Sequence, residues 1–243
     1  MCSFNLIQQL YNIQNTLARQ VITEDCFENL ESVAGADVSF SQDNKAVAAV
    51  VVLQLDDHVI LEKQTISVTL EFPYIPGFLG FRESNATISV LKKIKSNFDV
   101  LMVNGHGIMH PRGFGLASQV GVLLDVPTLG VAKRLINGRY IHQASQPYPE
   151  NETPQLILDS KRVVGAFFRR NYVSVGHKLS LNTVFEVIKR SSIYQTPEPL
   201  RQAHILATET FKRKIAGANS RKTDESDSNE NPGRNNFRLQ QRS

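Results

Sequence analysis

The stretch "FDVLMVNGHGIMHPRGFGLAS", residues 98–118, joins a short apolar run to a cluster of glycine, histidine and arginine. Its first part, 98–104, is typical of a buried strand, and the segment 113–125, "GFGLASQVGVLLD", favours a helix. Another apolar run follows at 126–132. Strand, helix and strand in this order predict two parallel strands joined by a crossover helix. The first strand would end at Asn104, where α/β sheets usually carry their chemistry.

The chain before this unit predicts a helix, an antiparallel meander and a second helix. Residues 4–22 repeat apolar side chains at helical spacing. Three runs rich in β-branched residues, at 32–40, 46–55 and 58–70, are separated by polar turns and predict three antiparallel strands. After a loop rich in proline and glycine, residues 81–97 place apolar side chains on one helical face.

The chain after this unit predicts a hairpin at 162–176 and helices at about 180–193 and 197–216. Three antiparallel strands followed by parallel strands, with flanking helices, is the order of the ribonuclease-H-like α/β fold. We therefore expect one domain over residues 1–216. Residues 217–243 contain few apolar side chains and cannot offset their ordering entropy, so we expect a disordered polar tail.

The composition is consistent with one folded domain. The chain has 243 residues, of which 41% are hydrophobic, enough for one sizeable core. The sequence shows neither a run of about 20 apolar residues nor a secretory signal, so we expect a cytoplasmic protein without a membrane partner. Cys2 and Cys26 are too few for a disulfide framework. The net charge of +4 gives weak support for a polyanionic partner.

Three polar residues interrupt segments that are otherwise apolar. Asp37 lies in "VAGADVSF", Glu83 follows the proline loop in "GFRES", and Asn104 ends a strand. A carboxylate in a core costs several kcal/mol unless a cation or hydrogen bonds compensate it, so Asp37 is a candidate metal ligand, and Glu83 and Asn104 are candidate functional residues. The alternatives are a strand-end aspartate that faces water, a helix-start glutamate and a turn-forming asparagine before glycine.

Five segments occur in a specific order along the chain: "VAGADVSF", "FPYIPGFLGFRE", "NGHGIMHPRGFGLAS", "PTLGVAKRL" and "YVSVGHKLS". Together they resemble endonuclease V, the deoxyinosine 3′ endonuclease family, over about residues 5–212. The resemblance implies a Mg²⁺-dependent DNA repair nuclease, with Mn²⁺ as a substitute, that acts on deoxyinosine in double- or single-stranded DNA. It implies cleavage of the second phosphodiester bond 3′ to the lesion, leaving a 5′-phosphate. Inosine in RNA is a further candidate substrate, and we expect a monomer.

The resemblance also implies roles for individual residues. Asp37 and Glu83 match the metal-binding carboxylates, with Asn104 as the third ligand. Lys133 matches a lysine near the scissile phosphate, where its charge can stabilise a developing oxyanion. His177 matches a histidine near the metal site that orients a water or moves a proton. Without the resemblance, an exposed lysine and a structural histidine would be the default interpretations.

The loop "PYIP" at 73–76 resembles the wedge with which the family enters the duplex at the lesion. Its prolines limit the conformations of the loop, and Tyr74 would be the inserted ring. The alternative is a hydrophobic turn that caps the core. The resemblance assigns lesion or DNA binding to Pro73, Tyr74, Ile75, Pro76, Gly77, Gly105, Gly107, His110, Arg112, Gly115 and Ser118.

The glycine-rich stretch suggests how a lesion would be recognised. Gly105, Gly107 and Gly115 would let backbone amides approach a flipped base or a phosphate closely. Gly113 can be explained by turn geometry alone. His110 and Arg112 would either support this loop or contact phosphate.

Asn104 departs from the family pattern, which has aspartate in "DGHG" or "DGQG". The amide oxygen can still bind a hard cation, but one negative charge is missing. At about 4 Å and an effective dielectric of about 20, that charge is worth at most about 4 kcal/mol, or roughly three decades of metal affinity. The chain is then a slow nuclease, a protein that binds inosine or branched DNA without cutting, or a protein in which Asn104 deamidates to aspartate.

Overall fold

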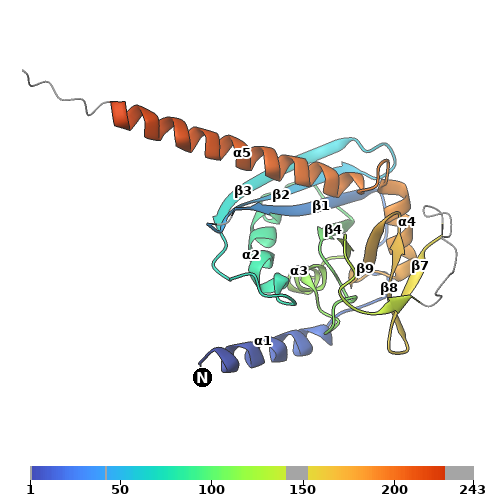
Figure 1. The fold of residues 1–243 in the computed structure, drawn as a ribbon. Coiled ribbons are helices and arrows are strands. Elements are labelled where there is room, and N and C mark those ends of the chain that lie inside the picture. Colours follow the sequence, from blue (N-terminus) through green and yellow to red (C-terminus); the bar gives the residue numbers. More distant parts are fainter. Residues whose placement is uncertain (1, 42, 141–152, 228–243) are drawn as a thin grey trace, which may run out of the picture.

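The computed structural model describes residues 2–41, 43–140 and 153–227, which form a mixed sheet with helices on both faces (Figure 1). The helices are α1 (Cys2–Ala18), α2 (Leu79–Leu91), α3 (Leu116–Leu124), α4 (Leu181–Ser191) and α5 (Glu198–Asp227). The strands are β1 (Ser32–Phe40), β2 (Lys45–Gln54), β3 (Ile60–Thr69), β4 (Val100–Asn104), β5 (Thr128–Ala132), β6 (Arg139–Tyr140), β7 (Gln155–Asp159), β8 (Arg162–Phe168) and β9 (Asn171–His177). In the described part of the chain, none of the helices is both long and apolar enough to cross a membrane.

The order of strands in the sheet is β3-β2-β1-β4-β5-β9-β8-β7-β6. The first three strands form the expected antiparallel meander, and β4 and β5 add to β1 in parallel. This arrangement confirms the predicted ribonuclease-H-like fold. The hairpin expected at 162–176 is the pair β8 and β9. The sequence analysis missed β6 and β7, because β7 is only five residues long and ends in aspartate.

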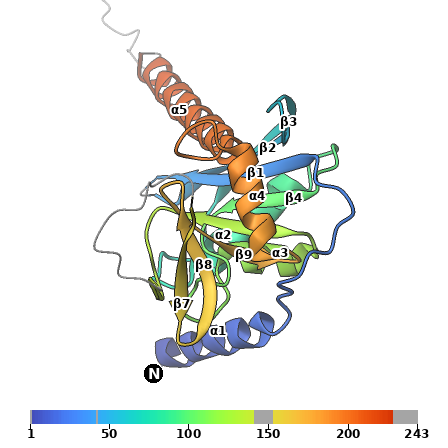
Figure 2. The same cartoon turned by 90° about the vertical axis from the view of Figure 1, so that its right-hand side faces the viewer.

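The helices form a layer on each face of the sheet (Figures 1 and 2). α2 and α3 pack on one face through Val90, Leu116 and Val120. α4 packs on the other face through Val184 and Val187, and the first part of α5 lies on this same face. α1 lies outside the α2 and α3 layer, where Tyr11 meets Phe78 edge to face. Both faces of the central strands are therefore buried, as their almost continuous apolar sequence requires.

Two helix ends differ from the predictions. α2 ends at Leu91 and not near 97, because the backbone amides of Lys95 and Ser96 donate to the Glu62 carboxylate on β3, both at 2.8 Å. α5 continues to Asp227, so the polar segment 217–227, expected to be disordered, is the end of this helix. Extending an existing helix adds a hydrogen bond without a new nucleation cost, so apolar side chains are not required there. Residues 228–243 lie outside the described residues.

Candidate metal and nucleic-acid site

Asp37 and Asn104 meet at the carboxyl edge of β4. The parallel register pairs Ala36 of β1 with Val103 of β4, so the next residues along each strand are neighbours. The Asn104 amide Nδ2 donates to Asp37 Oδ1 at 2.7 Å. Asp37 is 6% exposed, whereas Asn104 lies at the exposed end of its strand. The two residues singled out from separate apolar segments are therefore in direct contact.

His204 of α5 is a third member of this cluster, and the sequence analysis missed it. Its Nδ1 lies 2.8 Å from Asp37 Oδ2, so both oxygens of that carboxylate have a partner. The side chain of His204 is 64% exposed. The sequence feature that could have pointed to His204 is its place between Ala203 and Ala207. These two small residues are fully buried and mark the helix face that is turned toward the sheet.

Glu83 approaches the cluster from α2. It is 7% exposed, and among the described residues no hydrogen-bond partner of its carboxylate is found. Burial and, to a smaller extent, the charge of nearby Asp37 together raise the pKa of Glu83 to about 8, against the opposing effect of Arg82. The two carboxylates are thus close enough to repel, and a cation placed between them would relieve both the burial and the repulsion.

The donor set fits a hard divalent cation. Asp37, Glu83 and Asn104 offer carboxylate and amide oxygens from three separate elements, which is the ligand chemistry of Mg²⁺. Within the described chain, no three His, Cys, Asp or Glu side chains are already gathered as a metal site. Asp37, Glu83 and Asn104 together have the composition of an oxygen-ligand site, with an amide in place of a third carboxylate.

Lys133 lies on the same edge of the sheet, directly after β5. Its ammonium donates to Asn171 Oδ1 at 2.7 Å and to Thr196 Oγ1 at 3.0 Å. Partial burial of the ammonium lowers the pKa of Lys133. These two bonds turn the side chain toward β9 and the start of α5, beside the cluster of Asp37, Asn104 and His204 and without direct contact to it.

The chain matches the Endonuclease V family model over residues 15–205. It belongs to the endonuclease V family. An endonuclease V from Dictyoglomus thermophilum is 37% identical over 217 residues, which cover 86% of this chain and 93% of the relative. The catalytic domain of human endonuclease V superposes with a TM-score of 0.80 at 30% identity, covering 87% of this chain and 98% of the human one.

A further solved relative is the Ciona intestinalis endonuclease V in complex with a 23mer DNA that contains an inosine followed by a ribo-adenosine. It has a TM-score of 0.76 and 26% identity, and the match covers 86% of this chain and 98% of the relative. These matches confirm the resemblance drawn from the five sequence segments.

In this endonuclease V homologue, His177 lies away from the acidic cluster, so its predicted place is wrong. His177 pairs with Thr128 at the start of β5, whereas Asn104 pairs with Val131 near the other end. Three residues separate these rows, or about 10 Å along the strand. The ring of His177 accepts the amide of Ile22 at 3.2 Å and faces Asp125 at 3.4 Å. It joins the chain after α1 to β9.

The wedge loop, residues 73–77, exposes one aromatic ring and is anchored at its base. Tyr74 is 64% exposed. The carbonyl oxygen of Gly77 accepts hydrogen bonds from Gln14 Nε2 at 3.1 Å, His110 Nε2 at 3.0 Å and Arg112 Nη2 at 2.6 Å. α1 and the glycine-rich loop therefore hold the wedge from two sides.

His110 and Arg112, which were expected to support the glycine-rich loop or to contact phosphate, hold the wedge loop through Gly77 O. Burial, followed by the charge of Arg112, lowers the pKa of His110 to about 4, so the ring is neutral at pH 7. A neutral ring can accept the Arg112 amide at Nδ1 while it donates from Nε2. The guanidinium of Arg112 stacks over Tyr11 and Phe78, at 4.4 and 4.8 Å from their ring centroids.

The backbone amides of Gly105, Gly107 and Gly115, the glycines expected to let backbone amides approach a base or a phosphate, have partners within the protein. Gly105 donates to Val131 O at 2.9 Å, and Gly107 donates to Ser174 Oγ at 3.0 Å. Gly115 donates to Gly107 O at 3.1 Å. A Cβ at Gly107 would overlap the carbonyl of Val175, so this glycine lets the loop pack on β9.

Two further positions of the glycine-rich stretch are settled by their surroundings. Gly113 has φ of +63° with no atom near its missing Cβ, which agrees with a turn role. Ser118 lies on α3 with no exposed surface, so it is part of the interior and its predicted DNA contact is wrong. The first six residues of α3 are all buried, and Ser118 is one of them.

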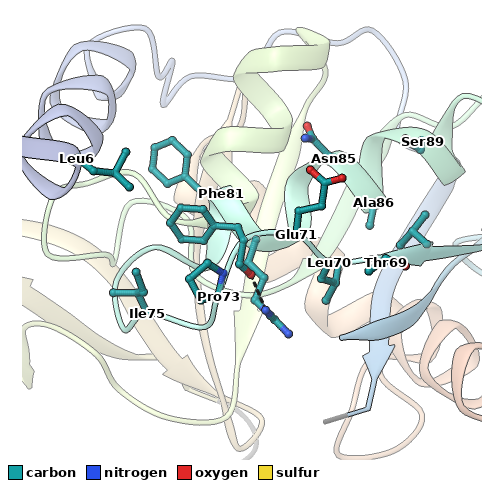
Figure 3. Close-up of a pocket in the computed structure, with 13 residues that line it drawn as sticks. Leu6, Thr69, Leu70, Glu71, Pro73, Ile75, Phe81, Asn85, Ala86 and Ser89 are labelled. Carbon is teal, nitrogen blue, oxygen red and sulfur yellow. Dashed lines mark hydrogen bonds between the residues drawn. The ribbon is translucent and has the colours of Figure 1, made fainter. Parts of the chain in front are cut away.

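A cavity of 520 Å³ lies beside the wedge loop (Figure 3). Pro73 and Ile75 form one side, Leu6 of α1 lies across from them, and Phe81 and Asn85 belong to α2. Its lining does not include Asp37, Glu83, Asn104 or His204. The cavity is therefore separate from the cluster around Asp37, and α2 stands between them.

Proposed function

We propose that this chain is a DNA repair endonuclease that recognises deoxyinosine and hydrolyses the second phosphodiester bond on its 3′ side with Mg²⁺. The observation that carries the proposal is the convergence of Asp37, Glu83 and Asn104 at one edge of the sheet in a member of the endonuclease V family. The relative in complex with inosine-containing DNA supports the choice of substrate.

Asp37, Glu83 and the amide oxygen of Asn104 would hold the cation, and Mn²⁺ would fit the same oxygens. When bound, the cation polarises a phosphoryl oxygen and lowers the pKa of a water. For Asn104 to serve as a ligand, its amide must turn so that the oxygen, and not Nδ2, faces the site. Asp37 then loses the hydrogen bond that it accepts in the metal-free protein.

The other side chains of the edge would act on the proton and on the phosphate. His204 is exposed and bound to Asp37, so it can orient a water or accept its proton. Lys133 would leave Asn171 and Thr196 and place its ammonium against the negative charge that develops on the phosphate. Tyr74 would enter the duplex beside the lesion, where mismatched pairs open most easily.

The alternative is a weakened or inactive protein that still binds inosine or branched DNA. The observation in its favour is the Asn104 amide, which donates to the same Asp37 oxygen that a cation would need. With two carboxylates in place of three, the cation would bind more weakly.

A nicking assay on an inosine duplex, titrated with Mg²⁺ and with Mn²⁺, separates these functions. We expect the natural chain to cut only at high cation concentration, and Asn104→Asp to cut at concentrations lower by 10-fold or more, within the ceiling of roughly three decades. Glu83→Gln is the matched control, because it removes a charge from the same site and should abolish cutting without loss of DNA binding. Tight binding of the natural chain without nicking at any cation concentration would leave the binding protein as the function.

Inosine in RNA is a second candidate substrate. The DNA in the Ciona complex carries a ribo-adenosine directly after the inosine, so that relative accepts a ribose next to the lesion. Competition between DNA and RNA strands of the same sequence, each with one inosine, would decide the preference of this chain. Equal competition would mean that the 2′-hydroxyl is not read at this site.

A further inference from the structure

An exposed aromatic side chain lies in the connection between α4 and α5. Tyr194 is 60% exposed, and its neighbour Ile193 is exposed as well. The guanidinium of Arg201 lies 5.0 Å from the centroid of the tyrosine ring. An aromatic ring backed by arginine is the kind of surface on which nucleobases stack.

Hydrogen bonds fix both the arginine that backs the ring and the connection that carries Tyr194. Glu198 fixes the guanidinium of Arg201 with two hydrogen bonds, both at 2.7 Å. The connection itself is tied down where Asn171 Nδ2 donates to Gln195 O at 2.7 Å and Arg169 Nη1 donates to Ser192 O at 3.2 Å. An arginine and a connection held in this way lose little conformational freedom when a ligand binds, which favours affinity.

Two sets of contacts join this ring to the acidic cluster. Arg201 and His204 are three residues apart on α5, hence on one helix face and about 4.5 Å apart along the axis, and His204 contacts Asp37. On the other side, Lys133 follows the end of β5 and donates to Thr196 in the same connection. Tyr194 is therefore adjacent to the proposed site of cleavage.

The wedge loop and Tyr194 belong to opposite layers of the molecule. The wedge loop leads into α2, which packs on one face of the sheet, while α4 and α5 lie on the other face (Figures 1 and 2). A strand whose lesion meets Tyr74 and whose backbone crosses the edge at Asp37 would continue toward Tyr194. Lys133 and Arg169 place positive charge along this course, as a phosphate backbone requires.

We propose that Tyr194, backed by Arg201, stacks on a nucleobase of the bound strand downstream of the cleaved bond. This inference rests on the proposed function, because it takes nucleic acid as the ligand of the edge. It makes the Tyr194–Arg201 pair the second aromatic contact of the site, on the opposite side of the acidic cluster from Tyr74.

The test measures binding, by fluorescence anisotropy in EDTA, to inosine-containing single strands that carry one abasic residue at successive positions 3′ to the lesion. We expect Tyr194→Ala to weaken binding of the intact strand by roughly 10-fold, and Tyr194→Phe to bind as the natural chain does. One abasic position should cause the same loss in the natural chain and no further loss in Tyr194→Ala. Leu123→Ala is the matched control, because it removes an exposed apolar side chain from the far end of α3.

Unchanged binding of Tyr194→Ala to every strand would overturn the inference and would indicate a protein contact for Ile193 and Tyr194. An abasic loss that is equal in Tyr194→Ala and in the natural chain at all positions would overturn it too. Failure of the proposed function has a different signature, which is equal affinity of the natural chain for inosine and adenosine strands.

Discussion

Asn104 places an amide, and not a further carboxylate, against Asp37. Its Nδ2 and the Nδ1 of His204 each meet one oxygen of Asp37, so the carboxylate keeps hydrogen-bond partners. A carboxylate at position 104 would instead face Asp37 as a like charge. The amide therefore removes a like-charge repulsion at the expense of cation affinity, and Glu83 is left as the carboxylate that most needs a positive partner.

Glu83 should make the metal-free protein less stable as the pH rises. Its ordinary pKa is 4.5, and burial next to Asp37 raises the folded value to about 8. A raised carboxyl pKa means that the folded state binds the proton more tightly, so this contribution is present below pH 4.5 and is lost as the pH rises through 8. Urea unfolding in EDTA at pH 5.5 and pH 9 should show a smaller pH dependence for Glu83→Gln than for the natural chain.

The control for this measurement is the cation. Mg²⁺ should stabilise the natural chain at pH 9 and leave Glu83→Gln almost unchanged, because the glutamine cannot compensate the charge of the ion. If the natural chain had the same unfolding free energy at both pH values, this would contradict a raised pKa of Glu83 in the folded protein.

Among elements, the wedge loop depends on a single carbonyl group that three side chains share. Gln14, His110 and Arg112 all donate to Gly77 O, and Arg112 also stacks on Tyr11 and Phe78. This arrangement ties α1, the wedge loop and the glycine-rich loop together through one carbonyl group. It also explains why a histidine and an arginine lie in the glycine-rich loop.

Arg112→Ala should therefore loosen the wedge. We expect a loss of about 2 kcal/mol in unfolding free energy, because a charged hydrogen-bond donor is removed from a partly buried site. Preference for an inosine strand over an adenosine strand should fall with it, as measured by anisotropy in EDTA. Tyr74→Ala serves as the control, since removal of an exposed ring should reduce the preference and leave stability unchanged. An intact preference in Arg112→Ala would separate lesion recognition from the anchoring of the loop.

The parallel core could be predicted from sequence because its strands are almost wholly apolar. Which residues meet at the site, however, depends on the register in which the strands pair. Asp37, Glu83 and Asn104 each interrupt an apolar or helical pattern, and that local signal was enough to single them out. His177 and His204 could not be ranked in the same way. Both follow apolar residues, and only the pairing of β5 with β9 and the path of α5 decide which imidazole reaches Asp37.

At the scale of the whole molecule, the last helix closes the site. A Cβ at Gly35 would overlap the backbone of Pro199, so α5 begins in close contact with β1. Farther along, Ala207 packs on Val47 and Ala49 of β2. α5 thus covers the meander and, in the same stretch, brings His204 to Asp37 and Arg201 to Tyr194. These contacts of α5 all come from residues 199–207.

Truncation tests this division of α5. A chain of residues 1–216 should unfold cooperatively with little change in melting temperature and should keep the nicking and binding of the full chain, because the contacts of Leu200, Ala203 and Ala207 remain. A chain of residues 1–197 should lose cooperative unfolding in a thermal melt, since Val47 and Ala49 would face water and Asp37 would lose His204. A large drop in melting temperature for residues 1–216 would mean that the polar end of α5 belongs to the folded domain.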